Sequence, residues 1–131
     1  MSSFEPQTRH FIGEDKCLKG TDWTRTHQFV DDNSATINMA DYDPANGGAG
    51  RMTVKSADLA TTYFDSQAGT ISLVWLDAAT IQIRIGHAYT SAISGTIPNS
   101  AIYQMEATSG STGLVDRILQ GRFQMDFEVA A

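Results

Sequence analysis

The histidine and cysteine side chains, which could bind a metal or move a proton, are few and lie far apart in this chain. The three histidines are His10, His27 and His87, and no two have the spacing that is typical of a zinc site. Cys17 is the only cysteine, and neither a second cysteine nor an adjacent histidine would activate its thiol. We therefore predict no metal and no cofactor. We expect Cys17 to be buried, and His27 to lie on a strand and form local hydrogen bonds.

Oxygen-rich stretches suggest two further kinds of chemistry, but both patterns are incomplete. Residues 41–48, DYDPANGG, place alternating oxygen ligands before glycine as calcium loops do, but Ala45 occupies the fifth position and no bidentate glutamate follows. Asp126 and Glu128 share a strand face, where carboxylates keep an edge soluble. A glycosidase needs two carboxylates that face each other across a cleft. We predict no catalytic residue, although a hydrolase with dispersed catalytic groups stays an alternative.

Size and charge restrict the partners that we expect. A chain of 131 residues favours one domain, which can bury a core without disulfides or a metal. The net charge of −6 repels phosphate groups, so we predict neither nucleic acid nor membrane as a partner. The first ten residues, MSSFEPQTRH, lack the apolar core of a signal peptide, and one cysteine forms no internal disulfide. We expect a protein that is made in the cytoplasm.

The hydrophobic pattern predicts an all-β fold. The clearest period of two lies in TIQIRIG, where Ile81, Ile83 and Ile85 share one face. Turns such as DDNS separate the other expected strands, which are WTRTHQFV, ATINM, RMTVK, TISLVWL and AIYQMEAT. HAYTSAISG is expected to form a short helix that ends at Gly95. SADLATTYFDSQAGT is either a loop or one helical turn capped by Ser56. Alternation indicates antiparallel sheets with one wet face, in a sandwich or a barrel.

The last segment alternates strictly from residue 123. Phe123, Met125, Phe127 and Val129 lie on one side, and we expect them to cover the core. Deletion of this segment should therefore unfold the protein. Gly121 precedes the alternation and should mark a bulge or bend where the strand changes its pairing.

Residues 1–20 are mixed and mostly polar, in contrast to a β-sandwich domain predicted over residues 21–131. We interpret them as an N-terminal arm or an irregular opening strand. Either the segment is frayed, as chain ends often are, or it docks on a neighbouring subunit. For the second case the candidate subunit-interface residues are Phe4, His10, Phe11 and Ile12.

The order of these segments resembles that of structural proteins from tailed-phage tails and baseplates. AIYQMEATSGSTGLVDRILQGRFQMDFEVA contains a strand with Tyr103 and Glu106, a turn, a strand with Arg117 and Leu119, and a glycine before an alternating strand. KGTDWTRTHQF, RMTVK and GTISLVW precede it in the family's order, so the likeness spans most of residues 19–129. The family's Gly-Asp pair is split here by Thr21, which leaves the register of the first strand open.

The resemblance implies an antiparallel immunoglobulin-like β-sandwich with a short helical turn, similar to the N-terminal module of baseplate upper or fibre-connecting proteins. It implies a virion structural protein that is not an enzyme, is assembled in the host cytoplasm and contacts other virion proteins in multiple copies. Its place in the particle stays open, capsid decoration included. The alternative is a stand-alone β-sandwich that binds carbohydrate or peptide. An aromatic platform for sugars would draw on Trp23, Trp75, Tyr42, Tyr63 and Tyr89. We expect Trp75 to be buried, which argues against that platform.

Overall fold

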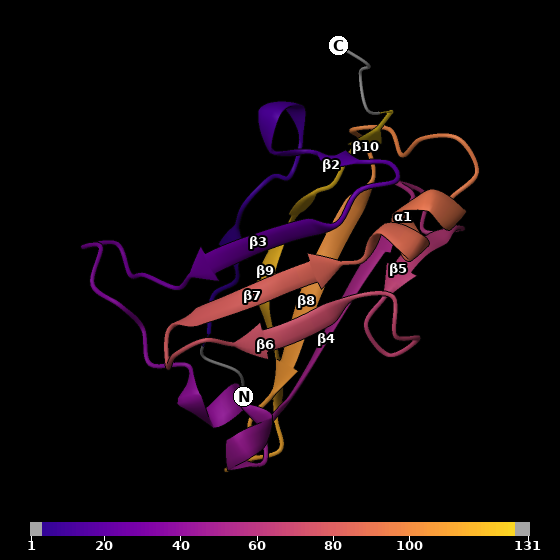
Figure 1. The fold of residues 1–131 in the computed structure, drawn as a ribbon. Helices are drawn as coiled ribbons and strands as arrows, with labels where there is room; N and C mark the ends of the chain where they lie inside the picture. Colours follow the sequence, from indigo (N-terminus) through magenta and orange to yellow (C-terminus); the bar gives the residue numbers. More distant parts are fainter. Residues whose placement is uncertain (1–3, 128–131) are drawn as a thin grey trace.

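The computed structural model describes residues 4–127 as two β-sheets around one core (Figure 1). The larger sheet has the strand order β1-β9-β8-β4-β5, the smaller one β3-β7-β6, and β10 pairs with β2 separately. The strands are β1 (Gln7–Thr8), β2 (Cys17–Leu18), β3 (Trp23–Gln28), β4 (Ala49–Lys55), β5 (Thr62–Asp65), β6 (Ser72–Trp75), β7 (Thr80–Ile85), β8 (Ile102–Thr108), β9 (Val115–Arg122) and β10 (Met125–Asp126). The predicted all-β class is confirmed.

Helical structure is confined to short pieces. The helix α1 (His87–Ala92) occupies the predicted position and ends three residues before Gly95. Single 3-10 turns lie at Gly13–Asp15, Ala40–Tyr42 and Pro44–Asn46. No helix within residues 4–127 is long and apolar enough to cross a membrane.

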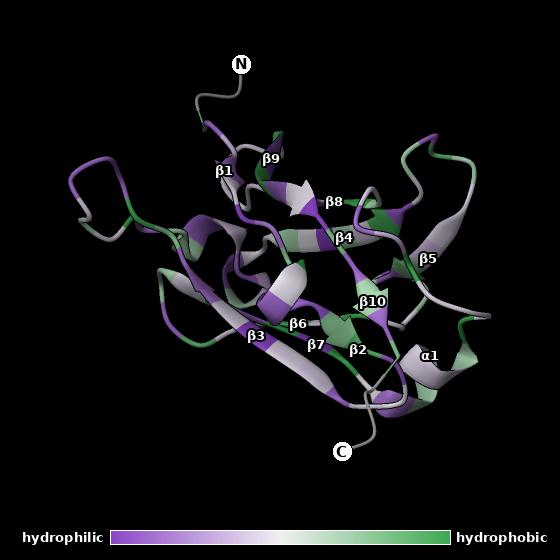
Figure 2. Cartoon of the chain, turned by 90° about the horizontal axis from the view of Figure 1, so that it is seen from above, coloured by the Kyte–Doolittle hydropathy of each residue, from purple (hydrophilic) through white to green (hydrophobic). Residues whose placement is uncertain are grey.

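The two sheets face each other, as Figure 2 shows from above, and residues of both form one buried core. Ile81, Ile83 and Ile85 of β7 are buried, as their spacing predicts. They pack in one apolar cluster with inward-facing residues of the larger sheet, which include Met52 and Val54 of β4. Alternation along each strand therefore places one face in the core and the other in water.

Two strand pairs depart from the antiparallel expectation. β1 runs parallel to β9, with Gln7 opposite Leu119, and β2 runs parallel to β10, with Cys17 opposite Met125. Both pairs join the first twenty residues to the last part of the chain, where the two segments run in the same direction. The larger sheet is consequently mixed, whereas the smaller sheet stays antiparallel.

The expected closing strand is divided into two. After Gly121 the chain changes its pairing, as predicted: Phe123 N–H donates to the Ala101 carbonyl, and Met125 exchanges two backbone hydrogen bonds with Ile97. Phe123 and Met125 are fully buried, but the prediction for Phe127 is wrong, because its side chain is 58% exposed and lies beside the Lys19 ammonium. Val129 lies outside the described residues.

Two loops also differ from expectation. ATINM forms no regular strand, because the Asp31 carboxylate accepts hydrogen bonds from Asn33 and Ala35 N–H and tightens the chain into a turn. One bridge, from Val30 to Thr36, is the pairing that follows. The ambiguous segment over residues 56–70 contains β5 between two turns. Its aromatic and β-branched residues outweigh the helix cap that Ser56 offered.

Candidate functional site

The N-terminal segment lies along the C-terminal segment of its own chain. Arg9 N–H donates to the Gln120 carbonyl, and Phe11 N–H donates to the Arg122 carbonyl, both at 2.9 Å. Between these two bonds, Arg122 N–H donates to Nδ1 of the His10 ring at 3.0 Å. A side-chain nitrogen thus replaces a backbone carbonyl in the ladder. Because these bonds satisfy the edge of β9, the segment belongs to the folded domain.

The four candidate subunit-interface residues lie at different depths in this segment. Phe11 is fully buried and its ring packs on Trp23 and Tyr103. Phe4 is half-buried against other aromatic rings, and Ile12 is also half-buried. His10 is exposed. Contact with a neighbouring subunit stays a prediction, and His10 has the most accessible side chain of the four.

Neither His27 nor Cys17 lies in surroundings that would make its side chain reactive. His27 lies on β3, as predicted, and its ring is hydrogen-bonded to Oε1 of Gln7, twenty residues away in the sequence, at 2.9 Å. Burial lowers the pKa of His27 to about 4, and the Arg9 guanidinium acts in the same direction, so the ring is neutral at pH 7. Burial raises the pKa of the Cys17 thiol to about 12, against a smaller opposite effect of Arg25. Cys17 is therefore a buried, protonated thiol, as predicted.

The carboxylates of the calcium-like loop are engaged within the chain. The Asp41 carboxylate accepts hydrogen bonds from the hydroxyls of Ser109 and Ser111, and these bonds lower the pKa of Asp41. Asp43 accepts from Ala45 N–H at 3.0 Å and starts a 3-10 turn. Across residues 4–127, no three His, Cys, Asp or Glu side chains gather as a metal site would require. The oxygen atoms of Asp41 fasten this loop to residues 109–111.

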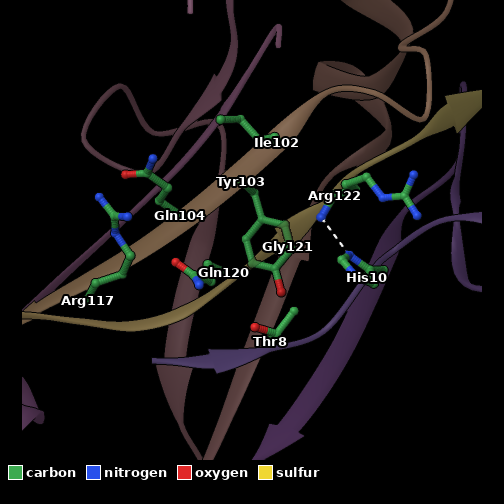
Figure 3. Close-up of a pocket in the computed structure, with 9 residues that line it drawn as sticks. All are labelled: Thr8, His10, Ile102, Tyr103, Gln104, Arg117, Gln120, Gly121 and Arg122. Atoms are coloured by element: carbon green, nitrogen blue, oxygen red, sulfur yellow. Dashed lines mark hydrogen bonds between the residues drawn. The ribbon is translucent and has the colours of Figure 1, made fainter. Parts of the chain in front are cut away.

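A shallow groove of about 360 Å³ lies on the outer face of the larger sheet (Figure 3). In β8 the residues Tyr103 and Met105 point into the core, so the alternate residues Ile102 and Gln104 face outward. The groove is lined by Thr8, His10, Ile102, Tyr103, Gln104, Arg117, Gln120, Gly121 and Arg122. It therefore joins three segments that are distant in sequence.

The groove has a cationic side chain on either side of its centre. Figure 3 shows Arg117 and Arg122 on opposite sides of Tyr103, and neither guanidinium has a carboxylate within 4.0 Å among the residues that the structure describes. The amides of Gln104 and Gln120 lie on the Arg117 side of Tyr103. These groups can donate hydrogen bonds to hydroxyl or carboxylate oxygens. Sequence reasoning missed the groove because its residues become neighbours only through the strand register.

The aromatic residues of the carbohydrate alternative form no common exposed surface. Trp23 is buried in the core, where its ring packs on Phe11 and Phe123. Trp75 is half-buried rather than fully buried, with its ring 5.8 Å from that of Phe29. Tyr89, on α1, is the exposed member of the set.

Comparison with known proteins adds no relative to this description. No protein-family model matches the sequence, and no curated protein matches it significantly.

Proposed function

We propose that this protein is a structural component of a tailed-phage particle, in the tail, the baseplate or a fibre connection, and that it acts through contacts with other virion proteins. The observation that carries the proposal is the exposure of large apolar side chains on the strands. Val74 of β6 and Leu76, two residues further on, are each about half exposed, at 48% and 53%. Residues two apart on a strand lie on the same face, so the two side chains are neighbours on one sheet edge, and an exposed apolar sheet edge is a place where another protein can bind.

The immunoglobulin-like arrangement is part of this proposal. Two sheets that share one core, in the orders β1-β9-β8-β4-β5 and β3-β7-β6, support it. The parallel pairs β1–β9 and β2–β10 are departures from a purely antiparallel sandwich, and they add a closure made from both ends of the described chain. These two pairs fix both ends of the described chain within the domain, as suits a small protein that is packed between neighbouring subunits.

The charge and the cysteine chemistry support the proposed partners and location. A net charge of −6 disfavours nucleic acid and anionic membranes, and so favours protein partners. The buried thiol of Cys17 forms no disulfide, which suits folding in the reducing cytoplasm of a host, where the particles would assemble. We propose a non-enzymatic protein that is present in several copies by symmetry.

The direct test is the composition of purified particles. Virions from a culture that carries the gene are banded on a density gradient, washed with high salt and analysed by quantitative mass spectrometry. We expect the protein at a fixed copy number relative to tail proteins, and immunogold labelling at one site on the tail. Recovery of the protein only in the host's soluble fraction would refute the structural role.

The groove favours a second function, that of a binding module for carbohydrate or peptide. Arg117 and Arg122, free of ion pairs within the described part of the chain, suit a ligand with acidic or hydroxyl groups. A glycan array that includes acidic oligosaccharides tests this function. Binding that is lost in Arg122→Ala but kept in Arg84→Ala, an exposed arginine of the smaller sheet, would favour the binding module. No binding to acidic or neutral glycans would count against a carbohydrate site.

A further inference from the structure

Strand β6 forms an open edge of the smaller sheet. It pairs with β7 on one side, with Ser72 opposite Arg84 and Val74 opposite Gln82. Leu76 N–H donates to the Thr80 carbonyl at 2.9 Å. Because backbone groups alternate in direction along an antiparallel strand, Leu73 and Trp75 direct their N–H and C=O groups away from β7. Within residues 4–127, no hydrogen bond reaches these outward groups from another segment.

The β6 edge lacks the features that block pairing at other edges. Exposed edges usually contain charges, proline or a bulge, which discourage the addition of a further strand. The edge strand β3 contains Arg25, and Nη1 of Arg9 donates to its Thr26 carbonyl. On β5, Asp65 pairs with Arg51, and its N–H donates to the Thr70 hydroxyl. In contrast, residues 70–76, TISLVWL, contain no charged residue.

We infer that β6 pairs antiparallel with β6 of a second copy of this chain. Two copies that each have a charge of −6 repel each other, so a contact between them is best made where acidic residues are missing. A two-fold axis at Val74 would place Leu73 opposite the partner's Trp75, and Trp75 opposite the partner's Leu73. Both residues offer outward N–H and C=O groups, so each pair would exchange two hydrogen bonds. A contact of this kind is self-complementary, as a two-fold dimer requires.

The side chains of β6 fit the same register. On the outer face, Val74 would meet Val74 of the partner subunit, and Leu76 would meet the partner's Ser72. On the inner face, Leu73 and Trp75 border an apolar cleft of about 70 Å³ between the sheets, which Met105 and Ile118 also line. Pairing would cover this cleft and join two three-stranded sheets into one of six strands. The inference rests on the proposed function as a structural protein, and it names β6 as one contact site and a second copy of the chain as its partner.

The first test is self-association in solution. A strand pair of four residues is a small contact, so we expect a weak dimer with a dissociation constant on the order of 0.1 mM. Sedimentation velocity measured up to about 1 mM protein, the range in which such a dimer forms, should show a monomer–dimer equilibrium. Val74→Lys places two lysines together at the axis and should weaken the dimer at least about tenfold. Val115→Lys is the matched control, because Val115 is equally exposed but lies on the larger sheet.

Two further measurements separate pairing from loss of fold. An equal mixture of Val74→Lys and Val74→Glu should restore the dimer, because opposite charges then meet at the axis. Val74→Cys should form a covalent dimer on mild oxidation, because opposed residues of an antiparallel pair lie within disulfide range. Val115→Cys is the control for random collision, and the native Cys17 is buried.

The outcomes distinguish this inference from the proposed function. A protein that stays monomeric at about 1 mM, and whose Val74→Cys variant crosslinks no faster than Val115→Cys, would overturn β6 pairing. If mass spectrometry still finds that protein in virions, the structural role stands and only the pairing fails. A reversible dimer that is lost with Val74→Lys and restored by the charge-matched mixture would support the pairing, whatever the particles contain.

Discussion

Replacement of Gly121 by alanine should displace the N-terminal segment. Gly121 lies where β9 passes the backbone of Arg9 most closely. A Cβ atom at this position would overlap the Arg9 carbonyl oxygen, and would lie 2.8 Å from the carbonyl carbon and 3.1 Å from Cε1 of Tyr103. Since the closest atoms belong to the backbone, no side-chain rotation relieves the overlap. The chain around Arg9 has to move.

The expected loss of stability follows from the contacts that meet at Arg9. Its carbonyl accepts a hydrogen bond from the buried Tyr103 hydroxyl at 2.6 Å, and its N–H donates to Gln120. Loss of the first costs about 1–3 kcal/mol because the hydroxyl stays buried, and loss of the second costs about 1 kcal/mol. Partial exposure of Phe11, two residues on, adds about 1–2 kcal/mol. The sum of about 3–6 kcal/mol is a large part of the 5–15 kcal/mol that is typical of a domain.

Urea unfolding, followed by tryptophan fluorescence, measures this difference. Trp23 reports on the same region because its ring packs on Phe11 and Phe123. The matched control is Gly50→Ala, since a Cβ there meets nothing closer than 3.7 Å, and we expect a change below about 1 kcal/mol. A Gly121→Ala variant with wild-type stability to within about 1 kcal/mol would refute the reasoning, because it would show that the N-terminal segment shifts at little cost.

Three further predictions concern single side chains. The pKa of His27 is lowered to about 4 in the folded protein, so the unfolded chain takes up the proton first as the pH falls. The free energy of unfolding should therefore be highest above about pH 6.5 and fall by about 1–3 kcal/mol towards pH 4. In urea titrations at several pH values, His27→Gln should flatten this slope. Met125→Ala should lower the free energy of unfolding by about 2–5 kcal/mol, and Phe127→Ala by less than about 0.5 kcal/mol. Equal losses of stability in thermal melts would contradict the assignment of Met125 to the core and Phe127 to the surface. Cys17 should react with a thiol reagent only after denaturation, and rapid labelling of the native protein would be inconsistent with its burial.

The strands with a clear local pattern could be predicted from the sequence. Ile81, Ile83 and Ile85 alternate with polar residues, and this pattern determines both the strand and its buried face. Met52 and Val54 alternate with polar residues in the same way along β4, and both are buried. Local alternation does not show where a core ends, however. The alternating pattern continues from Phe123 to Phe127. Other core residues cover Phe123 and Met125 but do not cover Phe127, whose side chain is exposed to water.

Long-range contacts could not be predicted in this way. The pairing of residues 7–8 with residues 119–120 spans most of the chain, and the N-terminal segment has no regular alternation that would reveal it. The groove depends on that pairing. Arg117, Gln104 and Thr8 become neighbours only once β1, β9 and β8 have their register, which a bulge beside Met105 shifts by one residue. The identity of each groove residue was visible in the sequence, but its neighbours were not.

The interlocked first and last segments have a consequence for how this chain reaches its folded state. Trp23 lacks the Phe123 ring that packs on it, and β1 and β2 lack their partner strands, until the last part of the chain arrives. During synthesis, therefore, the core cannot close before residue 125 or so has left the ribosome. Contacts of such high sequence separation slow folding, so the nascent chain would expose apolar strands for most of its time on the ribosome. We expect dependence on a ribosome-associated chaperone, which the finished molecule would no longer need.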